Sequence, residues 1–250
     1  MNAIQEPLIG HPVVSRDEWI EARKTLLARE KEVTRLYDQI CAERRELPWV
    51  KVEEDYVFQG PEGDVSLAEL FDGRSQLVIY HFMYGPGWEE GCKSCSFISD
   101  NIDAVNLHLP HHDVTLMAVS RAPFDEFQAF KKRMGWKFNW VSSAGNNFNF
   151  DYGVSFTEES MAKGYTTYNY APFDGSYPEL PGISVFYKDA SGDVYHTYST
   201  YARGGDILIG AHNWLDMTPL GRNEVEIMDW VRHHDKYESA AGNGGCCGCG

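Results

Sequence analysis

The sequence lacks the features of a membrane, secreted or nucleic-acid-binding protein. It has no run of about 18 apolar residues, so we expect no membrane span. Residues 1–12 have neither a basic start nor an apolar core, so we expect no secretory signal. Lys and Arg number 22 against 37 Asp and Glu, giving a net charge of −15 without any Lys/Arg-rich run. Because phosphate groups need cationic partners, we expect neither nucleic acid nor an anionic membrane as a ligand.

The chain also lacks the second ligand pair that a zinc site needs beside a Cys-x-x-Cys motif. The motif is Cys92-Lys93-Ser94-Cys95, and no second such pair lies in the body of the chain. We expect a cytoplasmic protein, because the sequence has no secretory signal. Thiols stay reduced in the cytoplasm, and there a Cys-x-x-Cys motif beside a βαβ pattern is typical of redox chemistry. We expect no metal and no cofactor; a zinc module and inert buried thiols are the alternatives.

The two cysteines lie between a buried strand and a helix. Residues 77–83 form an apolar run that predicts a strand, a Gly-Pro-Gly turn follows, and residues 97–109 read as helical. The start of a helix presents unpaired N–H groups and the positive end of its dipole, which stabilise a thiolate. The spacing therefore predicts Cys92 as the attacking thiol and Cys95 as the resolving one.

Three other residues are expected to shape this site. Lys93 favours the thiolate at Cys92, whereas the acidic residues just before the motif oppose it. Trp88 shields the sulfur or belongs to the core. Arg121, at the C-terminal end of a central strand, stabilises an anion at the site or forms a surface salt bridge.

The remaining chain predicts an α/β fold with helices on both faces of a central mixed sheet. Strands at 114–120 and 140–142 flank a helix at 122–134, and residues 183–187 and 194–201 form a hairpin. The aromatic segment 146–180 has no clear period. It covers either the cysteines or the core elsewhere.

Helical extensions are predicted on both sides of the α/β domain. Residues 15–46 form a long helix that starts with a capping box and carries an apolar heptad stripe, which packs on the domain or forms a homodimer contact. A C-terminal helix is expected at 222–233. The domains are thus 1–49, 50–215, 216–238 and 239–250. The last is a Gly-rich tail expected to be flexible, whose cysteines bind a soft metal, exchange with the site or have no specific role; they are Cys246, Cys247 and Cys249.

Residues 82–97, with the sequence FMYGPGWEEGCKSCSF, resemble the DUF899 family of thioredoxin-like proteins. The similarity covers about residues 15–225 and includes residues 119–123, 133–136, 195–204 and 215–222. Members are described as predicted dithiol-disulfide oxidoreductases, so the resemblance implies a thioredoxin-like fold and a protein or small-molecule disulfide or thiol as partner. In such folds a cis proline faces the attacking cysteine. Pro181 lies near the position of that proline. The alternative is that Pro181 precedes this position by one residue and Gly182 occupies it.

A peroxiredoxin-like thiol peroxidase is a rival enzyme function. Peroxiredoxins are similar in layout but carry Pro-x-x-x-Thr-x-x-Cys, in which the Thr hydroxyl orients the peroxide. Here Pro86 precedes Cys92 by six positions, and no Thr lies between them. Disulfide exchange is therefore favoured over peroxide reduction. A non-enzymatic thiol or metal-binding module is the alternative from a different class.

Overall fold

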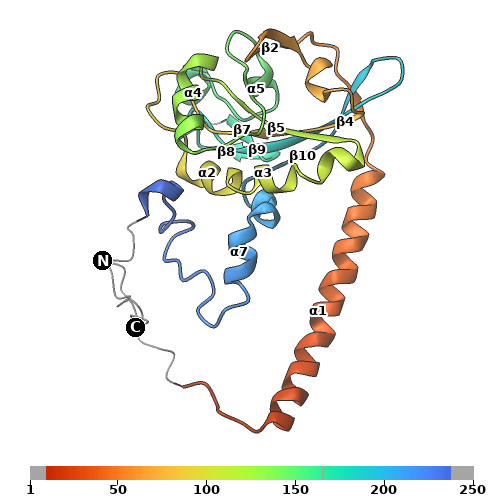
Figure 1. Ribbon diagram of the computed structural model, residues 1–250, viewed down its shortest axis with the longest axis vertical. Helices are drawn as coiled ribbons and strands as arrows, with labels where there is room; N and C mark the ends of the chain where they lie inside the picture. The colour runs from red at the N-terminus through yellow and green to blue at the C-terminus, as the bar shows by residue number, and fades with distance from the viewer. Residues whose placement is uncertain (1–9, 165, 238–250) are drawn as a thin grey trace, which may run out of the picture. The chain divides into compact units, whose positions relative to one another are not determined.

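The computed structural model describes residues 10–164 and 166–237, and it divides the chain into two units. The first unit is Met1–Pro48 and the second is Trp49–Gly250 (Figure 1). The predictions for Cys246, Cys247 and Cys249 lie outside the described residues. None of the helices within the described ranges combines the length and apolar content that a bilayer crossing requires.

The first unit contains one long helix, α1 (Arg16–Arg45). Its predicted capping box is confirmed: the Ser15 hydroxyl accepts the Glu18 N–H at 3.3 Å, and the Glu18 carboxylate accepts the Ser15 N–H at 2.9 Å. Pro48 follows three residues after the end of the helix, where its ring prevents continuation. None of the α1 side chains is buried. Packing and homodimer contact both remain predictions for its heptad stripe.

An eight-stranded mixed sheet organises the second unit. Its order is β1-β10-β9-β4-β5-β6-β2-β3. Strands β4, β5 and β6 run parallel, β9 is antiparallel to β4, and β10 is antiparallel to β9. The order β10-β9-β4-β5 is that of a thioredoxin-like sheet, as predicted. The strands are β1 (Val50–Lys51), β2 (Val57–Gly60), β3 (Gly63–Ser66), β4 (Gln76–His81), β5 (Val114–Ser120), β6 (Trp140–Ser142), β9 (Gly182–Lys188) and β10 (Val194–Tyr201).

Helices cover both faces of this sheet. Figure 1 shows α2 and α3 along one face and α5 along the other. A separate hairpin, β7 (Thr166–Tyr168) and β8 (Ala171–Phe173), lies within the aromatic segment. The helices of this unit are α2 (Lys93–Ser99), α3 (Ile102–Val105), α4 (Phe124–Arg133), α5 (Phe148–Asp151), α6 (Glu158–Ala162) and α7 (Gly210–Leu215), with 3-10 turns η1 (Glu69–Phe71), η2 (Leu109–His112), η3 (Ala202–Leu208) and η4 (His234–Lys236).

Strand β4 separates two hydrophobic cores because alternate residues of a strand point to opposite faces. Tyr80 belongs to the cluster that contains Cys95 of α2 and the aromatic residues of α4. Leu77 and Ile79 belong to the other cluster, with Phe148 of α5. The continuous apolar character of this strand therefore follows from burial on both faces.

One polar chain crosses the second core. His81 Nε2 lies 2.8 Å from Ser184 Oγ, which lies 2.9 Å from Ser199 Oγ, and His196 Nε2 lies 2.7 Å from the same Ser199 oxygen. The His81 ring also stacks on Phe148. Burial lowers the pKa of His81 to about 3, so this imidazole is neutral near pH 7.

The prediction of a C-terminal helix at 222–233, in the segment 216–238, is wrong. The chain there forms turns, and only η4 is regular. Asn223 and Met228 have φ values of 48° and 59°, which a right-handed helix excludes. The apolar residues of this segment do not form one buried helix face, because Val225 is 95% exposed whereas Val231 is fully buried.

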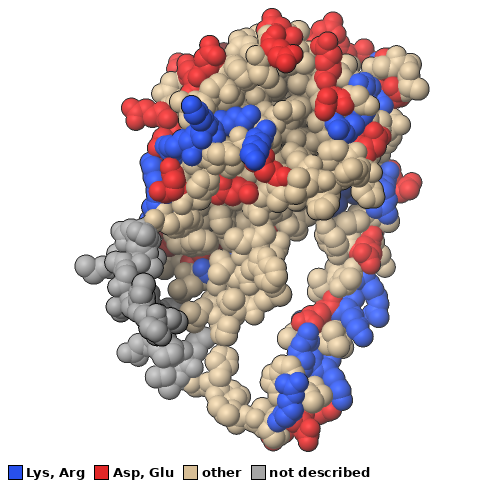
Figure 2. Space-filling model, viewed as in Figure 1, with Lys and Arg blue, Asp and Glu red and all other residues tan. Residues whose placement is uncertain are grey.

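The face of the molecule in Figure 2 carries both charges. Acidic side chains reach its upper edge, and basic side chains lie among them lower down, so neither sign occupies this face alone. Ion pairs occur on the surface of the second unit: Lys51 contacts Asp193 at 2.7 Å, which joins β1 to the hairpin loop. Such exposed pairs contribute about 0–1 kcal/mol each. The two cores carry most of the stability.

Gly182 provides a test of how closely the sheet packs at its cysteine end. A Cβ there would lie 2.8 Å from both Tyr201 and Val154. We expect Gly182→Ala to lower the free energy of unfolding by about 1–3 kcal/mol, as overpacking does, measured by chemical denaturation. Gly205→Ala is the matched control, because its Cβ would meet only Ile183 at 3.4 Å. Equal losses in the two variants would contradict this account.

Candidate redox site around Cys92 and Cys95

Cys92 lies at the N-cap position of α2, where the loop after β4 turns back. Its N–H donates to the Met83 carbonyl at 3.1 Å, and its own carbonyl accepts the Ser96 N–H and hydroxyl, each at 2.9 Å. The first bond fixes the motif to the end of β4, and the others begin the helix. Both thiols are thereby held at the C-terminal edge of the central parallel strands, where α/β sheets place their sites.

The loop before Cys92 depends on close backbone approaches. A Cβ at Gly91 would lie 2.5 Å from the Phe82 ring and 2.9 Å from Phe130, so no larger residue fits without movement. The Trp88 ring lies over Gly85, where a Cβ would come 2.9 Å from its indole nitrogen. Trp88 and Cys92 are both partly buried against the core cluster that includes Cys95. Trp88 thus contributes to the wall beside the thiols.

The two cysteines are free thiols in unlike environments. Cys92 is half-buried, and Cys95 is 1% exposed. A hydrogen bond from the Cys95 thiol, helped by the N–H groups of Cys95 and Ser94, lowers the pKa of Cys92 to about 6 despite its burial. Burial, followed by the hydrogen bond and charge of Cys92, raises the pKa of Cys95. One sulfur is therefore a thiolate near pH 7 and the other a thiol.

Tyr80 lies beneath Cys95 in the core. Its hydroxyl is buried and makes no full hydrogen bond to any of the described residues. It is still close enough to the Cys95 sulfur to lower the pKa of that thiol, as does the Met83 N–H at 3.5 Å. Burial raises the pKa of Tyr80 well above its usual value. The phenol therefore stays protonated and faces the resolving sulfur.

The charged residues beside the motif point away from Cys92. The Lys93 ammonium donates to the carbonyls of Met228 at 3.4 Å and Asp229 at 3.5 Å. The groups that lower the pKa of Cys92 are uncharged donors, first the Cys95 thiol and then the N–H groups of Cys95 and Ser94, and they act against its burial. The uncharged donors at the start of α2 therefore stabilise the Cys92 thiolate, whereas the sequence predicted that Lys93 also stabilises it.

Arg121 joins β5 to the aromatic segment. Its Nε donates to Glu179 at 2.5 Å, and the other oxygen of that carboxylate accepts the Ser155 hydroxyl at 2.5 Å. Glu179 is only 2% exposed, so this pair is more buried than a surface salt bridge. The guanidinium also lies 5.5 Å from the Phe150 ring. Its charge is thus already partnered beside the strand end.

The expectation of a cis proline near the cysteines is wrong for the described residues, which contain no cis peptide bond. Gly182 pairs with His81 at the first position of β9, where there is no room for a Cβ, and Pro181 enters the strand in the trans form. The Pro181 carbonyl accepts the Tyr168 hydroxyl at 2.6 Å. Pro181 and Tyr80 both line a 30 Å³ cavity beneath the motif.

Tyr168 shows what the aromatic segment contributes here. Its hydroxyl also accepts the Ala202 N–H at 3.0 Å, and it joins the segment to β9 and β10. Burial raises the pKa of Tyr168 to about 12. The segment therefore packs at Pro181, which lines the same small cavity as Tyr80. The position of Tyr80 could have been predicted from the sequence, because the alternation of residues along β4 places it on the face that carries Cys95. No sequence pattern predicts the position of Tyr168.

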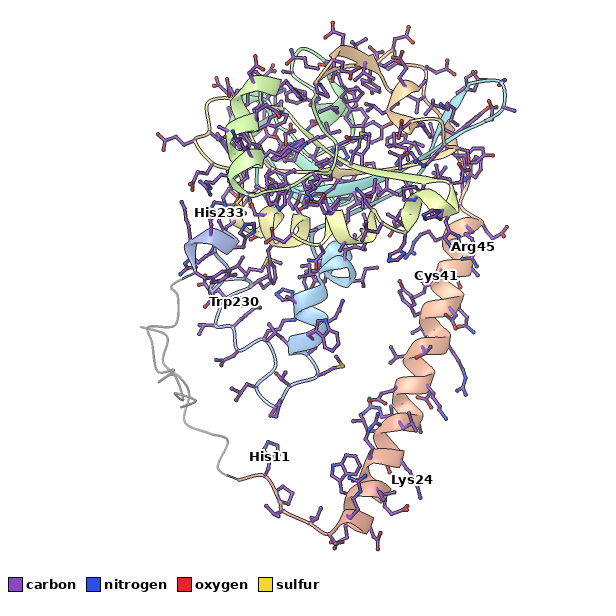
Figure 3. All side chains as sticks on the ribbon, viewed as in Figure 1. His11, Lys24, Cys41, Arg45, Trp230 and His233 are labelled. Carbon is purple, nitrogen blue, oxygen red and sulfur yellow. The ribbon has the colours of Figure 1, made fainter. Side chains whose placement is uncertain are left out.

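A further element reaches the motif from the C-terminal part of the chain. We call residues 228–237 the C-terminal strap. His233 of the strap lies beside the start of α2 in Figure 3, and its Nε2 lies 2.8 Å from the Gly91 carbonyl. Two strap residues bind the loop and α4: Lys236 contacts Glu90 at 2.6 Å, and Asp235 contacts Arg133 at 3.0 Å. Nothing in the local sequence indicates that this histidine is buried beside the cysteines.

Metal ligation by the site itself finds no support in the described part of the chain. Within residues 10–164 and 166–237, no three His, Cys, Asp or Glu side chains converge in a way that could hold a metal ion. The ring nitrogens near the motif already have partners, since His233 contacts Gly91 and His234 contacts Asp100 at 2.7 Å. The groups that the described site offers for chemistry are the two sulfurs of Cys92 and Cys95.

Comparisons with known proteins identify a family. Peroxidoxin BcpB from Mycobacterium tuberculosis is 11% identical with a TM-score of 0.45, covering 65% of this chain and 94% of the other. Peroxiredoxin Q from Xanthomonas campestris is 13% identical with a TM-score of 0.39, covering 65% and 96%. The sequence matches no curated protein. The family described as "Bacterial protein of unknown function (DUF899)" matches residues 9–237, so the chain belongs to the DUF899 family.

Proposed function

We propose that this protein is a thiol–disulfide oxidoreductase in which Cys92 attacks and Cys95 resolves. The observation that carries the proposal is the placement of the two thiols: Cys92 is half-buried at the N-cap of α2, and Cys95 is buried within the first turn of that helix. With a pKa of about 6, roughly nine tenths of Cys92 is thiolate at pH 7, because one pH unit changes the ratio of thiolate to thiol tenfold. A half-buried thiolate beside a fully buried thiol is the arrangement that stepwise exchange needs.

The reaction proceeds through a mixed disulfide. The Cys92 thiolate attacks one sulfur of the substrate disulfide, forming an S–S bond to Cys92 and releasing the other substrate sulfur as a thiolate that takes a proton. Cys95 then loses its proton and attacks the Cys92 sulfur, which releases the second substrate thiol. The substrate gains two electrons and two protons, and Cys92 and Cys95 become a disulfide. An external dithiol restores the reduced pair.

Tyr80 has a positioning role in the second step. Cys95 must lose a proton in a site that disfavours its thiolate, since burial raises its pKa. The Tyr80 hydroxyl and the Met83 N–H are the groups that counteract this burial. They stabilise the charge that develops on Cys95 as it attacks, and the 30 Å³ cavity beside Tyr80 has room for a water molecule.

Disulfide exchange should depend on Cys92 alone among the described cysteines for its first step. We expect Cys92→Ser to abolish dithiothreitol-driven reduction of a protein disulfide, and Cys95→Ala to stop turnover after one mixed disulfide. Cys41→Ser, in α1, should keep full activity. Assays of insulin reduction, with hydrogen peroxide as a parallel substrate, measure both chemistries. Full activity of the Cys92 variant, or turnover of peroxide alone, would refute the proposal.

The reactivity of Cys92 should titrate near pH 6. Its folded pKa is lowered, so alkylation by iodoacetamide should stay fast at pH 7 and fall as pH drops through about 6. Cys95→Ala removes the main donor and should move the midpoint upward, and a midpoint one pH unit higher slows alkylation at pH 6 about fivefold. Mass spectrometry of the alkylated peptide measures the rate. An unchanged midpoint would show that Cys95 does not stabilise the thiolate.

Removing the Tyr80 hydroxyl should slow resolution and spare attack. In Tyr80→Phe the pKa of Cys95 should rise further, so collapse of the mixed disulfide should slow several-fold and its pH profile should move upward. Tyr84→Phe is the matched control, since Tyr84 lies in the same core and donates to the Glu126 carbonyl at 3.4 Å instead. Stopped-flow release of a chromogenic thiol separates the two steps. Equal effects of the two variants would remove Tyr80 from the mechanism.

A further inference from the structure

We propose that the C-terminal strap selects the substrate of Cys92: it admits small-molecule disulfides and holds back disulfides that belong to a polypeptide chain. The inference rests on the proposed thiol exchange and names the substrate class for it. The strap is bonded to the residues on both sides of Cys92. A polypeptide disulfide therefore reacts only after the strap has moved, whereas a small disulfide reacts while the strap is closed.

The strap lies along the start of α2. On one side of Cys92, the Gly91 carbonyl lies 2.8 Å from His233 Nε2. On the other side, the Lys93 ammonium donates to the Met228 carbonyl at 3.4 Å. Four residues lie between Met228 and His233, so both contacts belong to one short, continuous segment. The strap thus follows the motif from one neighbour of Cys92 to the other.

Apolar contacts hold the middle of the strap against α2 and α4. The Trp230 ring meets the Phe97 ring of α2 edge-on, with ring centroids 5.4 Å apart. Val231 is fully buried, and the His233 ring, which is 6% exposed, lies 5.3 Å from the Phe130 ring. Because burial of apolar groups is favourable, the closed position is the stable one.

Ion pairs hold the outer end of the strap. Lys236 contacts Glu90 at 2.6 Å, and Arg133 contacts both Glu90 and Asp235, the latter at 3.0 Å. The hydrogen bonds from Lys236 and Arg133 lower the pKa of Glu90 to about 2, so the carboxylate stays ionised at neutral pH. These side chains are one third to one half exposed, and water weakens such pairs. The outer end can therefore be loosened without disturbing a core.

The chain just before the strap is weakly packed. Val225 is 95% exposed and Ile227 is 69% exposed. Met228, the first residue of the strap, has a φ of 59°, which is a costly conformation for a residue other than glycine. Segments with few buried contacts open at a lower free energy than the rest of a fold. The strap can therefore open about this segment while the sheet stays intact.

The geometry of a mixed disulfide explains the selection. The two Cα atoms of a disulfide typically lie about 4.4–6.8 Å apart, so a polypeptide substrate must bring its own chain that close to Cys92. The strap occupies part of this space, because His233 is bonded to the residue next to Cys92. A small disulfide brings only a few atoms to the half-buried sulfur. Closure of the strap therefore slows the first class of substrate and not the second.

The reaction with a small disulfide is balanced. The Cys92 thiolate attacks bis(2-hydroxyethyl) disulfide, forms an S–S bond to one mercaptoethanol unit and releases the other as a thiolate that takes a proton. Cys95 then loses its proton, attacks the Cys92 sulfur and releases the second mercaptoethanol. The substrate gains two electrons and two protons, and dithiothreitol, which becomes oxidised, reduces the Cys92–Cys95 disulfide again.

Loosening the outer end of the strap tests the selection in the full chain. Lys236→Ala should raise kcat/KM for insulin several-fold, because loss of one exposed ion pair raises the open population up to about fivefold. Its kcat/KM for bis(2-hydroxyethyl) disulfide should stay within about twofold of the parent value, with dithiothreitol as the donor in both assays. Lys163→Ala is the matched control, because it removes an exposed ion pair to Glu159 of α6 and should change neither value.

Trapping of the first step measures access to Cys92 directly. Cys95→Ala, with and without Lys236→Ala, is mixed with each disulfide, and mass spectrometry follows the mixed disulfide at Cys92. The added substitution should speed the bond to insulin several-fold and leave the bond to mercaptoethanol unchanged. Equal changes for the two reagents, no change for either, or the same gain for insulin in Lys163→Ala would overturn the inference.

These outcomes are separate from failure of the proposed function. If the parent chain reduces bis(2-hydroxyethyl) disulfide and Cys92→Ser does not, the exchange chemistry stands whatever the strap variants show. If none of the proteins reduces either disulfide, or Cys92→Ser reduces both as fast as the parent chain, the proposed function and the inference fail together.

Discussion

The proposed thiol chemistry depends on the contact between Cys92 and Cys95, whose thiols lie in unlike environments. The Cys95 thiol donates to Cys92, and the same contact lowers the pKa of one group and raises that of the other. A pair placed in equal environments would share a proton and have no fixed order of attack. Here the N–H groups at the start of α2 stabilise the Cys92 thiolate, and the hydrophobic core buries Cys95. The proposed order of attack thus follows from where the helix begins.

The sheet holds the Cys92–Cys95 motif in place through residues at the end of β4 and just past it. The Cys92 N–H is bonded to Met83 just past the end of β4, and Tyr80 of the same strand lies under Cys95. Gly91 lets the loop cross the Phe82 and Phe130 rings closely enough for this. The strap and the aromatic segment then close the site from two other directions, through His233 and Tyr168. Three segments far apart in sequence therefore surround two sulfurs.

Elements of the fold could be predicted from the sequence where the local residue pattern agrees with the tertiary structure. The capping box at Ser15 and the strands at 114–120 and 194–201 appear as predicted because each is specified by neighbouring residues. The motif and the helix start were readable for the same reason. The thioredoxin-like fold followed from the order of these elements and from the family resemblance.

What the sequence did not reveal depends on long-range contacts. The segment 222–233 has helical apolar spacing, but left-handed residues and the burial of Val231 hold it in a turn-rich path. Tyr168 and His233 reach the cysteines from 76 and 141 residues beyond Cys92, and no local pattern encodes such contacts. Lys93, adjacent to Cys92, was the obvious cation, yet its side chain binds strap carbonyls.

The buried polar chain from His81 to His196 has a consequence for acid tolerance. The unfolded chain protonates the His81 imidazole near pH 6.5, whereas the folded chain does so only near pH 3. Because the unfolded state binds the extra proton between these values, acidification in that range favours unfolding by up to about 1.4 kcal/mol per pH unit. Acid therefore weakens the scaffold over an interval that includes the pH near 6 at which the Cys92 thiolate takes up a proton.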